Sequence, residues 1–388
     1  MIGSAIVLMY ADARETLRLN SVFAIDTEEH ALLLDCCGNV WNAVLSSQQN
    51  VEREKENVNP WEIIDLACIG TKTVCSLSVS EGSIYVLTEE GDLWVMGSNV
   101  HGELGIGSFV NQSNLVAVPL NVSVVQVVAS GFMAAILDSN GGVWTCGMSA
   151  LGKMGQRSVP LPERFTRIRI KAETAIQKIA LGVSDHILLD TSGCTWFCGS
   201  TDCTGDAESH FTPWRIYICD RKIVDISCGD HALFLDEDGI VWGTKYGTNE
   251  LDSSLRVSDL VDQHLEVYNL TSQYNLPKVI AITAGYGSNF VIDEHYSVHS
   301  HGDNEYGKLG IGRSEDFIDR FQIVEGLPPI IEVICDWDRT YFVSAVSTIW
   351  ASGLQWFAQS HNSTPVEFTD WPRTKIPSKA QQIKSARN

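Results

Sequence analysis

Short apolar segments of strand length recur along this chain at an even spacing. Each repeated pair of segments contains a Trp, or in one case a His, and these anchor residues lie 53, 50, 52, 46, 57 and 51 residues apart. Self-similarity with a period of about 50 residues is typical of repeat architectures, in which a unit buries its apolar face only against its neighbours. The anchors are Trp41, Trp94, Trp144, Trp196, Trp242, His299 and Trp350.

The fullest repeat, residues 83–107, shows what one unit contains. Residues 84–87 and 93–96 are apolar runs rich in β-branched and aromatic side chains, which favour strands. The link between them, residues 88–91, ends in Gly and has equivalents that begin with Asp. Asp accepts a backbone hydrogen bond in a tight turn, and Gly tolerates positive φ at its end. Each link therefore predicts a β-hairpin.

The register of these links decides how the recurring acids are interpreted. Asp138, Asp190 and Asp236 each occupy the first turn position of a different repeat, so we interpret them as structural turn residues and not as catalytic carboxylates. The sixth and seventh links, residues 293–296 and 344–347, lack the glycine, and we expect looser turns there.

Fifty residues accommodate four short strands with their turns, which is the content of one propeller blade. Tight hairpins require antiparallel neighbours and so argue against a solenoid of parallel strands. The sequence predicts an all-β fold: a seven-bladed β-propeller with four antiparallel strands per blade. We expect the apolar residues 5–10 to close the ring with strands of the last blade, and residues 365–368 could serve from the other end. The propeller would span residues 1–371, and a basic tail would span residues 372–388.

A second repeated phrase carries a family resemblance. Residues 97–105 and 302–310 read Gly-x-Asn-x-x-Gly-x-Leu-Gly, and residues 147–155 are a variant. This phrase resembles the repeat of the regulator of chromosome condensation family, and the resemblance covers nearly the whole chain. In that family a Trp precedes the Gly at the end of the second strand, and this chain has other residues in place of that Trp. They are Met96, Cys146, Cys198, His301 and Ser352.

Two functions remain open. The first is a non-enzymatic scaffold that binds protein partners. The second, implied by the resemblance, is a guanine nucleotide exchange factor for a Ran-like small GTPase, which acts by displacing nucleotide without covalent chemistry. The family version uses an inserted hairpin, for which the 52 residues from Trp144 to Trp196 leave little room. We expect no classical catalytic site and no cofactor, because no nucleophile–base pair escapes the repeat register.

Charge and cysteine usage limit which partners and which cellular compartment we expect for this protein. The formal charge of −21 disfavours nucleic-acid binding by the propeller body, since phosphate contacts dominate such affinity. Eleven scattered cysteines suit a reducing compartment, so we expect a cytoplasmic or nuclear protein. No apolar stretch is long enough to span a bilayer. We also expect the protein to be a monomer. Cysteines 194, 198 and 203 with nearby histidines match no common zinc spacing, so we expect no metal.

Deviations from the repeat are where binding residues are expected. One such segment is basic on an acidic chain, and it contains Arg157, Arg164, Arg167, Arg169 and Lys171. Protection of an outer edge strand is the alternative interpretation. The other segment, residues 251–275, places apolar residues on one face of a short helix that either docks a partner or covers its own blade. These residues include Val257, Leu260 and Val261.

Overall fold

The computed structural model describes residues 22–25, 30–34, 40–44, 61–148, 152–155, 163–171, 175–183, 185–199, 210–218, 220–244, 267–313, 315–335, 337–345, 348–354 and 361–367. In these ranges the chain forms four-stranded antiparallel sheets that follow one another along the sequence. Each sheet uses four consecutive strands in sequence order, as expected of propeller blades.

The first four sheets have the following strands: β1 Val22–Ile25, β2 His30–Leu34, β3 Val40–Val44 and β4 Trp61–Ile63; β5 Val74–Ser80, β6 Ser83–Thr88, β7 Leu93–Gly97 and β8 Gln112–Ala117; β9 Val124–Ser130, β10 Met133–Asp138, β11 Val143–Gly147 and β12 Thr166–Arg167; β13 Ile176–Leu181, β14 Asp185–Asp190, β15 Thr195–Gly199 and β16 His210–Ile216.

The remaining sheets are β17 Ile223–Cys228, β18 Ala232–Asp236, β19 Val241–Thr244 and β20 Val267–Asn269; β21 Val279–Ala284, β22 Ser288–Asp293, β23 Val298–Asp303 and β24 Phe317–Ile323; β25 Ile330–Cys335, β26 Arg339–Ser344, β27 Ile349–Leu354 and β28 His361–Glu367. Three short helical segments accompany them: η1 Ala67–Ile69, α2 Leu270–Tyr274 and η3 Glu305–Gly307.

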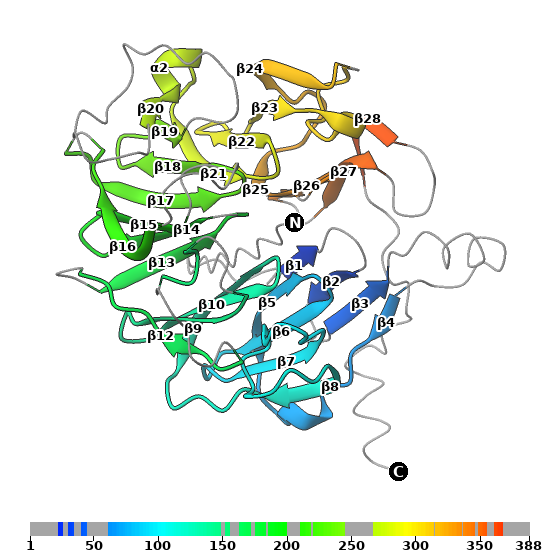
Figure 1. The fold of residues 1–388 in the computed structure, drawn as a ribbon. Helices are drawn as coiled ribbons and strands as arrows, with labels where there is room; N and C mark the ends of the chain where they lie inside the picture. The colour runs from blue at the N-terminus through cyan, green and yellow to red at the C-terminus, as the bar shows by residue number, and fades with distance from the viewer. Residues whose placement is uncertain are drawn as a thin grey trace, which may run out of the picture.

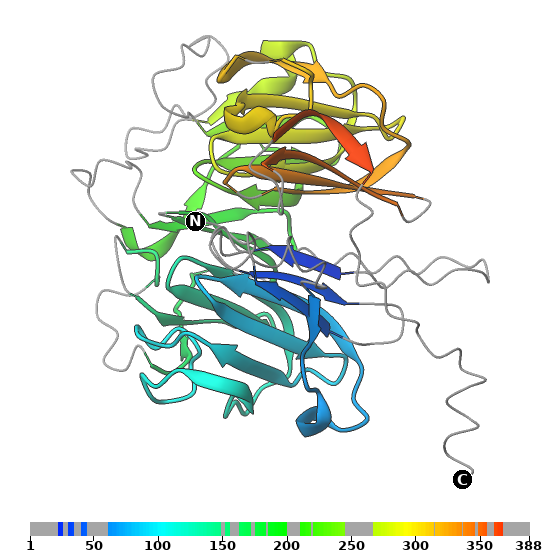
Figure 2. The same ribbon diagram turned by 90° about the vertical axis from the view of Figure 1, so that its right-hand side faces the viewer.

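The sheets are arranged around a common centre (Figure 1). The first strand of each sheet is innermost, because β1, β5, β9, β13, β17, β21 and β25 contact one another in succession. The loops after the first and third strands of each sheet lie at one end of the ring, which we call the loop rim. The hairpins between the second and third strands lie at the opposite end, which we call the turn rim. Figure 2 shows the ring from the side.

The predicted ring of seven blades closed by terminal strands needs correction. The last sheet is complete from its own consecutive strands, and in the described residues it pairs with no N-terminal strand. Instead, β1 lies against β5 on one side and β25 on the other. Six blades of four strands, β5 to β28, are described with their packed side chains, not seven. Because the sheet β1–β4 precedes them, these six are numbered second to seventh below. In the sheet β1–β4, Leu34 and Val40 are the strand side chains that are described, and both join the core beside β5. The all-β propeller with four antiparallel strands per blade is confirmed.

The core lies between neighbouring sheets. The second strands are buried along their whole length, as in β6, β10 and β14, because a blade covers each face. One core cluster, for example, joins Phe197 of β15 to Ile226 and Phe234 of the next sheet. This is the packing expected when a repeat cannot bury its own apolar face.

The turn rim follows the predicted turn chemistry. Gly141 has a φ of 78°, and its N–H donates to the carbonyl oxygen of Asp138 at 2.9 Å. The sixth link, expected to be looser, keeps the same bond: the N–H of Tyr296 donates to the carbonyl oxygen of Asp293 at 2.9 Å. Tyr296 itself adopts a φ of 63°, the left-handed conformation that Gly provides elsewhere.

Candidate partner-binding rim

Adjacent blades are joined edge to edge at the loop rim. The N–H of Val183 donates to the carbonyl oxygen of Gly229 at 3.1 Å, and the N–H of Asp230 donates to that of Gly285 at 3.3 Å. Gly229 is required by this close approach, since a Cβ there would lie 2.1 Å from the carbonyl oxygen of Gly285. Backbone links between blades make the loop rim a rigid platform.

A buried lysine fastens the sixth and seventh blades at this rim. Lys308 is fully buried, and its Nζ donates to the carbonyl oxygens of Tyr286 and Trp337 at 2.9 and 2.7 Å. The same Nζ lies 2.5 Å from an oxygen of Asp303. The rings of Tyr286 and Trp337 stack with centroids 3.4 Å apart. All three ammonium donors are therefore used, and the two loops are held together by one side chain.

Lys153 occupies the same repeat position in the third blade. Its Nζ donates to the carbonyl oxygens of Ser130 and Val183 at 3.2 and 3.3 Å, and so connects the third and fourth blades. Burial lowers the pKa of Lys153 to about 8. In the sequence the Gly-x-Leu-Gly phrase serves only as the basis of a family resemblance, and the function of its second residue is missed. The signal was a lysine at the same place in two otherwise apolar phrases.

Two carboxyl groups at this rim also have altered proton affinity. Burial raises the pKa of Asp185 to about 7, although the nearby Lys153 acts to lower it. The Sγ of Cys228 lies 3.5 Å from the same carboxyl group. Burial likewise raises the pKa of Asp230 to about 6. The rim therefore changes its charge near neutral pH, but in the described residues these groups fit no nucleophile–base arrangement.

Exposed apolar side chains concentrate on the loop rim. In the part of the chain that the structure describes, fourteen large hydrophobic residues are exposed, and seven of them lie in the loops of this rim or at their ends. These seven are Val100, Phe109, Val110, Met148, Val183, Tyr306 and Phe317. Interaction sites are marked by apolar side chains that gather on one surface, so these seven residues are candidates for such a site. Neither charge nor helical periodicity distinguishes them in the sequence.

The loops that carry these residues are held by buried asparagines. Asn99 donates from Nδ2 to the carbonyl oxygen of Ser108 at 2.7 Å, while its Oδ1 accepts from the N–H of Leu104 at 3.0 Å. Asn304 makes the matching bonds in the sixth blade, to the carbonyl oxygen of Glu315 at 2.8 Å and from the N–H of Leu309 at 3.1 Å. Both loops thus present their tips in a fixed conformation.

The described residues of the predicted cationic segment lie toward both ends of the ring. Arg164 lies over Gly107 at the loop-rim end, whereas Arg167 in β12 lies beside Asp138 at the turn-rim end. Arg169 and Lys171 continue past β12 and are exposed. Arg157 lies outside the described residues, as do Val257, Leu260 and Val261. The binding assignments made from sequence therefore stay predictions.

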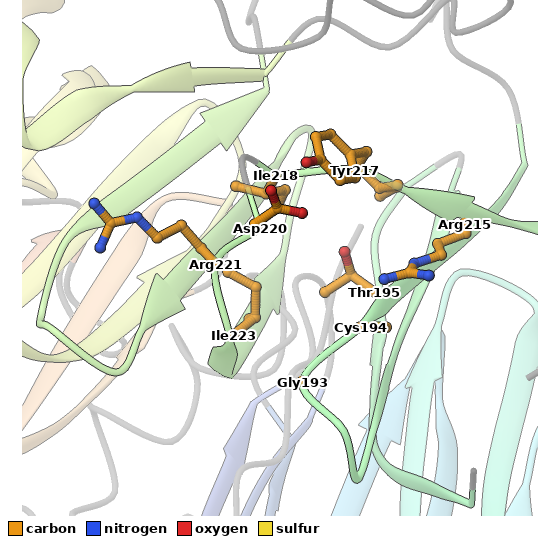
Figure 3. Close-up of a pocket in the computed structure, with 10 residues that line it drawn as sticks. Gly193, Cys194, Thr195, Arg215, Tyr217, Ile218, Asp220, Arg221 and Ile223 are labelled. Atoms are coloured by element: carbon orange, nitrogen blue, oxygen red, sulfur yellow. The ribbon is translucent and has the colours of Figure 1, made fainter. Parts of the chain in front are cut away.

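A small pocket lies at the turn rim between the fourth and fifth blades (Figure 3). Its wall includes Thr195, Arg215 and Tyr217. Arg221 extends away toward the next blade, where its guanidinium lies 2.6 Å from the carboxylate of Asp238. This pairing balances the charge of Arg221. Among the described residues, no cluster of three or more His, Cys, Asp or Glu is arranged to hold a metal ion.

Comparisons with known proteins agree with the geometry. No family model matches the sequence. The regulator of chromosome condensation of Mus musculus is 24% identical over 335 residues, which cover 78% of this chain and 75% of that protein. The secretion-regulating guanine nucleotide exchange factor of Bos taurus is 26% identical over 163 residues, 39% of this chain and 35% of that protein. Among solved structures, Prp20p of Saccharomyces cerevisiae, described with its binding properties to Gsp1p and histones, has a TM-score of 0.65 at 18% identity, covering 94% of this chain and 84% of that one.

The fold and its loop-built rim define a repeat β-propeller. The repeated Gly-x-Asn-x-x-Gly-x-Leu-Gly phrase and the curated relatives support a divergent member of the regulator of chromosome condensation repeat family. In the described residues no helix is long and apolar enough to cross a membrane.

Proposed function

We propose that this chain is a non-enzymatic propeller that binds a protein partner on its loop rim. The observation that carries the proposal is that, among the described residues, half of the exposed large hydrophobic side chains lie on this one rim. The buried residues Asn99, Asn304 and Lys308 hold the loops beneath them. A rigid platform with apolar anchors loses little conformational entropy when a partner binds, and this favours affinity.

Guanine nucleotide exchange on a Ran-like small GTPase is the second candidate. It is supported by the names of two relatives, a regulator of chromosome condensation and a secretion-regulating exchange factor. Exchange requires no covalent chemistry, which is compatible with a rim that lacks a nucleophile–base pair in its described residues. A partner of this class would contact Tyr306 and Phe317 through apolar surface, and its acidic groups would be attracted by the cationic segment.

The test separates binding from exchange. Binding of Ran·GDP and of nucleotide-free Ran to the full chain is measured by calorimetry, and release of labelled GDP is followed with and without the chain. The variants Tyr306→Ser and Phe317→Ser should weaken binding at least tenfold together. Val366→Ser is the matched control, because Val366 is 48% exposed but lies on the outer strand β28.

The outcomes decide between the two candidates. Binding without faster GDP release supports the scaffold and rejects exchange. Faster release that both rim variants reduce supports exchange through the loop rim. Equal binding by the rim variants and the control would contradict the assignment of the rim. If Ran does not bind at all, crosslinking to other partners through a photoreactive group at position 306 tests the rim, and crosslinking only from position 366 would overturn it.

A further inference from the structure

An unusually long part of this chain carries almost no charge. Residues 93–137, 45 in all, contain a single Asp, Glu, Lys or Arg, which is Glu103, whereas such residues make up 19% of the whole chain. At that frequency about nine would be expected in the segment. Glu103 is buried, with 1% of its surface exposed. The surface that this segment forms is therefore uncharged on a protein of net charge −21.

The segment is exposed at the outside of the second blade. Its exposed residues include a loop tip at residues 109–111 and two positions of β8, Ser113 and Asn114. In the loop tip, Phe109 and Val110 are 52% and 65% exposed. We call the exposed residues between 100 and 125 the uncharged face. It combines an apolar tip with an open strand.

β8 is the outermost strand of its blade (Figure 1). Among the described strands it pairs with β7 alone, so one backbone edge of this six-residue strand has no strand partner. Natural proteins usually protect such an edge with charged residues or proline, because it would otherwise pair with another chain. β8 contains neither.

The other outer strands do carry such protection. β12 contains Arg167, β24 contains Asp319 and Arg320, and β28 contains Pro365 and Glu367. Both β16 and β4 also contain a charged residue. β20 has three residues and continues directly into α2, which leaves little edge to pair. The open edge of β8 therefore differs from every other long outer strand that is described.

We propose that β8 pairs antiparallel with β8 of a second copy of this chain, so that the propeller forms a two-fold dimer through the uncharged face. The charge distribution favours a second copy of the chain as the partner of this surface. Two copies with a charge of −21 each repel one another wherever their acidic surfaces meet, and the uncharged face is where close approach costs least. A two-fold axis also makes the contact self-complementary, since each β8 offers the same backbone groups to the other.

The loop tip supplies apolar area beside the paired strands. Asn99 is fully buried and fixes the loop, and its Nδ2 also donates to the carbonyl oxygen of Val110 at 3.2 Å. Val110 precedes β8 by two residues, so the tip lies at the N-terminal end of the strand. In an antiparallel pair this end meets the C-terminal end of the partner's β8. The dimer replaces the monomer that the sequence analysis expects.

The test is the oligomeric state of the full chain. Sedimentation velocity over a range of micromolar concentrations should show a monomer–dimer equilibrium. Because like charges oppose the association, added salt should strengthen the dimer by screening them, the reverse of the salt effect on an ion-paired interface. The variants Ser113→Lys and Asn114→Lys should each weaken dimerisation at least tenfold, since a charged residue on an edge strand opposes its pairing with another strand and the two-fold axis doubles the effect.

The matched control is Asn121→Lys, which adds the same charge to the same uncharged face but lies outside β8. It should retain most of the dimer, and all variants should keep the melting temperature of the parent chain. A monomer at every concentration and salt would overturn the proposal. A dimer that Asn121→Lys weakens as much as Asn114→Lys, or one that salt dissociates, would also overturn it by placing the contact elsewhere.

Discussion

Trp144 donates a hydrogen bond from its indole Nε1 to the Oδ2 of Asp138 at 2.8 Å. The other carboxylate oxygen of Asp138 accepts from the backbone N–H groups of Asn140 and Gly142 at 2.9 and 2.8 Å. One aspartate therefore closes the hairpin and fixes the anchor tryptophan six residues later. The pairs Trp196–Asp190, Trp242–Asp236 and His299–Asp293 repeat the contact at 3.1, 3.0 and 2.9 Å.

The second blade lacks this bond, and a substitution should supply it. Thr88 stands at the position that Asp138 occupies in the next blade, and among the described residues the buried Nε1 of Trp94 has no hydrogen-bond partner. An unsatisfied buried donor costs about 1–3 kcal/mol. Thr88→Asp should raise the free energy of unfolding by about 1 kcal/mol, measured by urea denaturation. Thr88→Asn is the control, because the single oxygen of its amide cannot accept from both the turn backbone and the Nε1 of Trp94. An equal gain in stability in both variants would contradict the explanation.

The turn of the sixth blade stores backbone strain that can be removed. Tyr296 has a φ of 63° where the turns of the second to fifth blades use Gly, and its side chain is 45% exposed. The left-handed conformation costs a residue with a side chain roughly 1–2 kcal/mol. Tyr296→Gly should therefore stabilise the protein by about 1 kcal/mol. Tyr296→Ala keeps the strain and should give no gain, and a gain of the same size in that variant would show that removing the exposed ring is the cause.

Asp185 should make the protein less stable as the pH rises. Burial raises its pKa from 3.8 to about 7 in the folded chain. Between these values the native state keeps a proton that the unfolded state has released, so the free energy of unfolding falls with increasing pH. At roughly 1.4 kcal/mol per pKa unit, the fall is on the order of 2–4 kcal/mol.

Asp185→Asn removes this group from titration. Its free energy of unfolding relative to the parent chain should increase from pH 4 to pH 7, as measured by urea denaturation at several pH values. The control is Asp238→Asn, at an exposed turn position. A difference between parent and Asp185→Asn that does not vary with pH would show that Asp185 does not titrate in this range.

The sequence predicts those parts of the fold that local chemistry determines. The period, the hairpins and the turn role of Asp138, Asp190 and Asp236 follow from residue types at fixed spacings. Ring closure depends on contacts between residues far apart in sequence, here the packing of β1 against β25. No local pattern encodes that contact. The closing strand expected at residues 5–10 lies outside the described residues.

The candidate site was harder to predict for the same reason. Lys153 and Lys308 act through the carbonyl oxygens of neighbouring blades, which only the ring brings near them. Arg167 was selected for its charge, but its neighbour Asp138 precedes it by 29 residues and is a structural group. Charge alone therefore cannot separate a binding arginine from one that supports a turn.

This distinction leads to a prediction about the cationic segment. Arg169 and Lys171 are exposed beyond β12. Burial alone would raise the pKa of Asp138, but hydrogen bonds from Trp144 and the turn backbone, together with the charge of Arg167, hold it below its usual value. If a Ran-like GTPase is the partner, Arg169→Glu and Lys171→Glu should slow its association several-fold by reversing electrostatic attraction. The loss should shrink at high salt, where screening removes long-range steering.

Arg167→Glu should behave differently from these two variants. A glutamate beside Asp138 adds repulsion at the turn, so it should lower the free energy of unfolding by about 1 kcal/mol, whereas Arg169→Glu should change it by less than about 0.5 kcal/mol. Stopped-flow association with labelled Ran·GDP gives the rates, and urea denaturation gives the stabilities. If Arg169→Glu leaves the association rate unchanged at low salt, the segment does not steer the partner, and edge protection remains as its function.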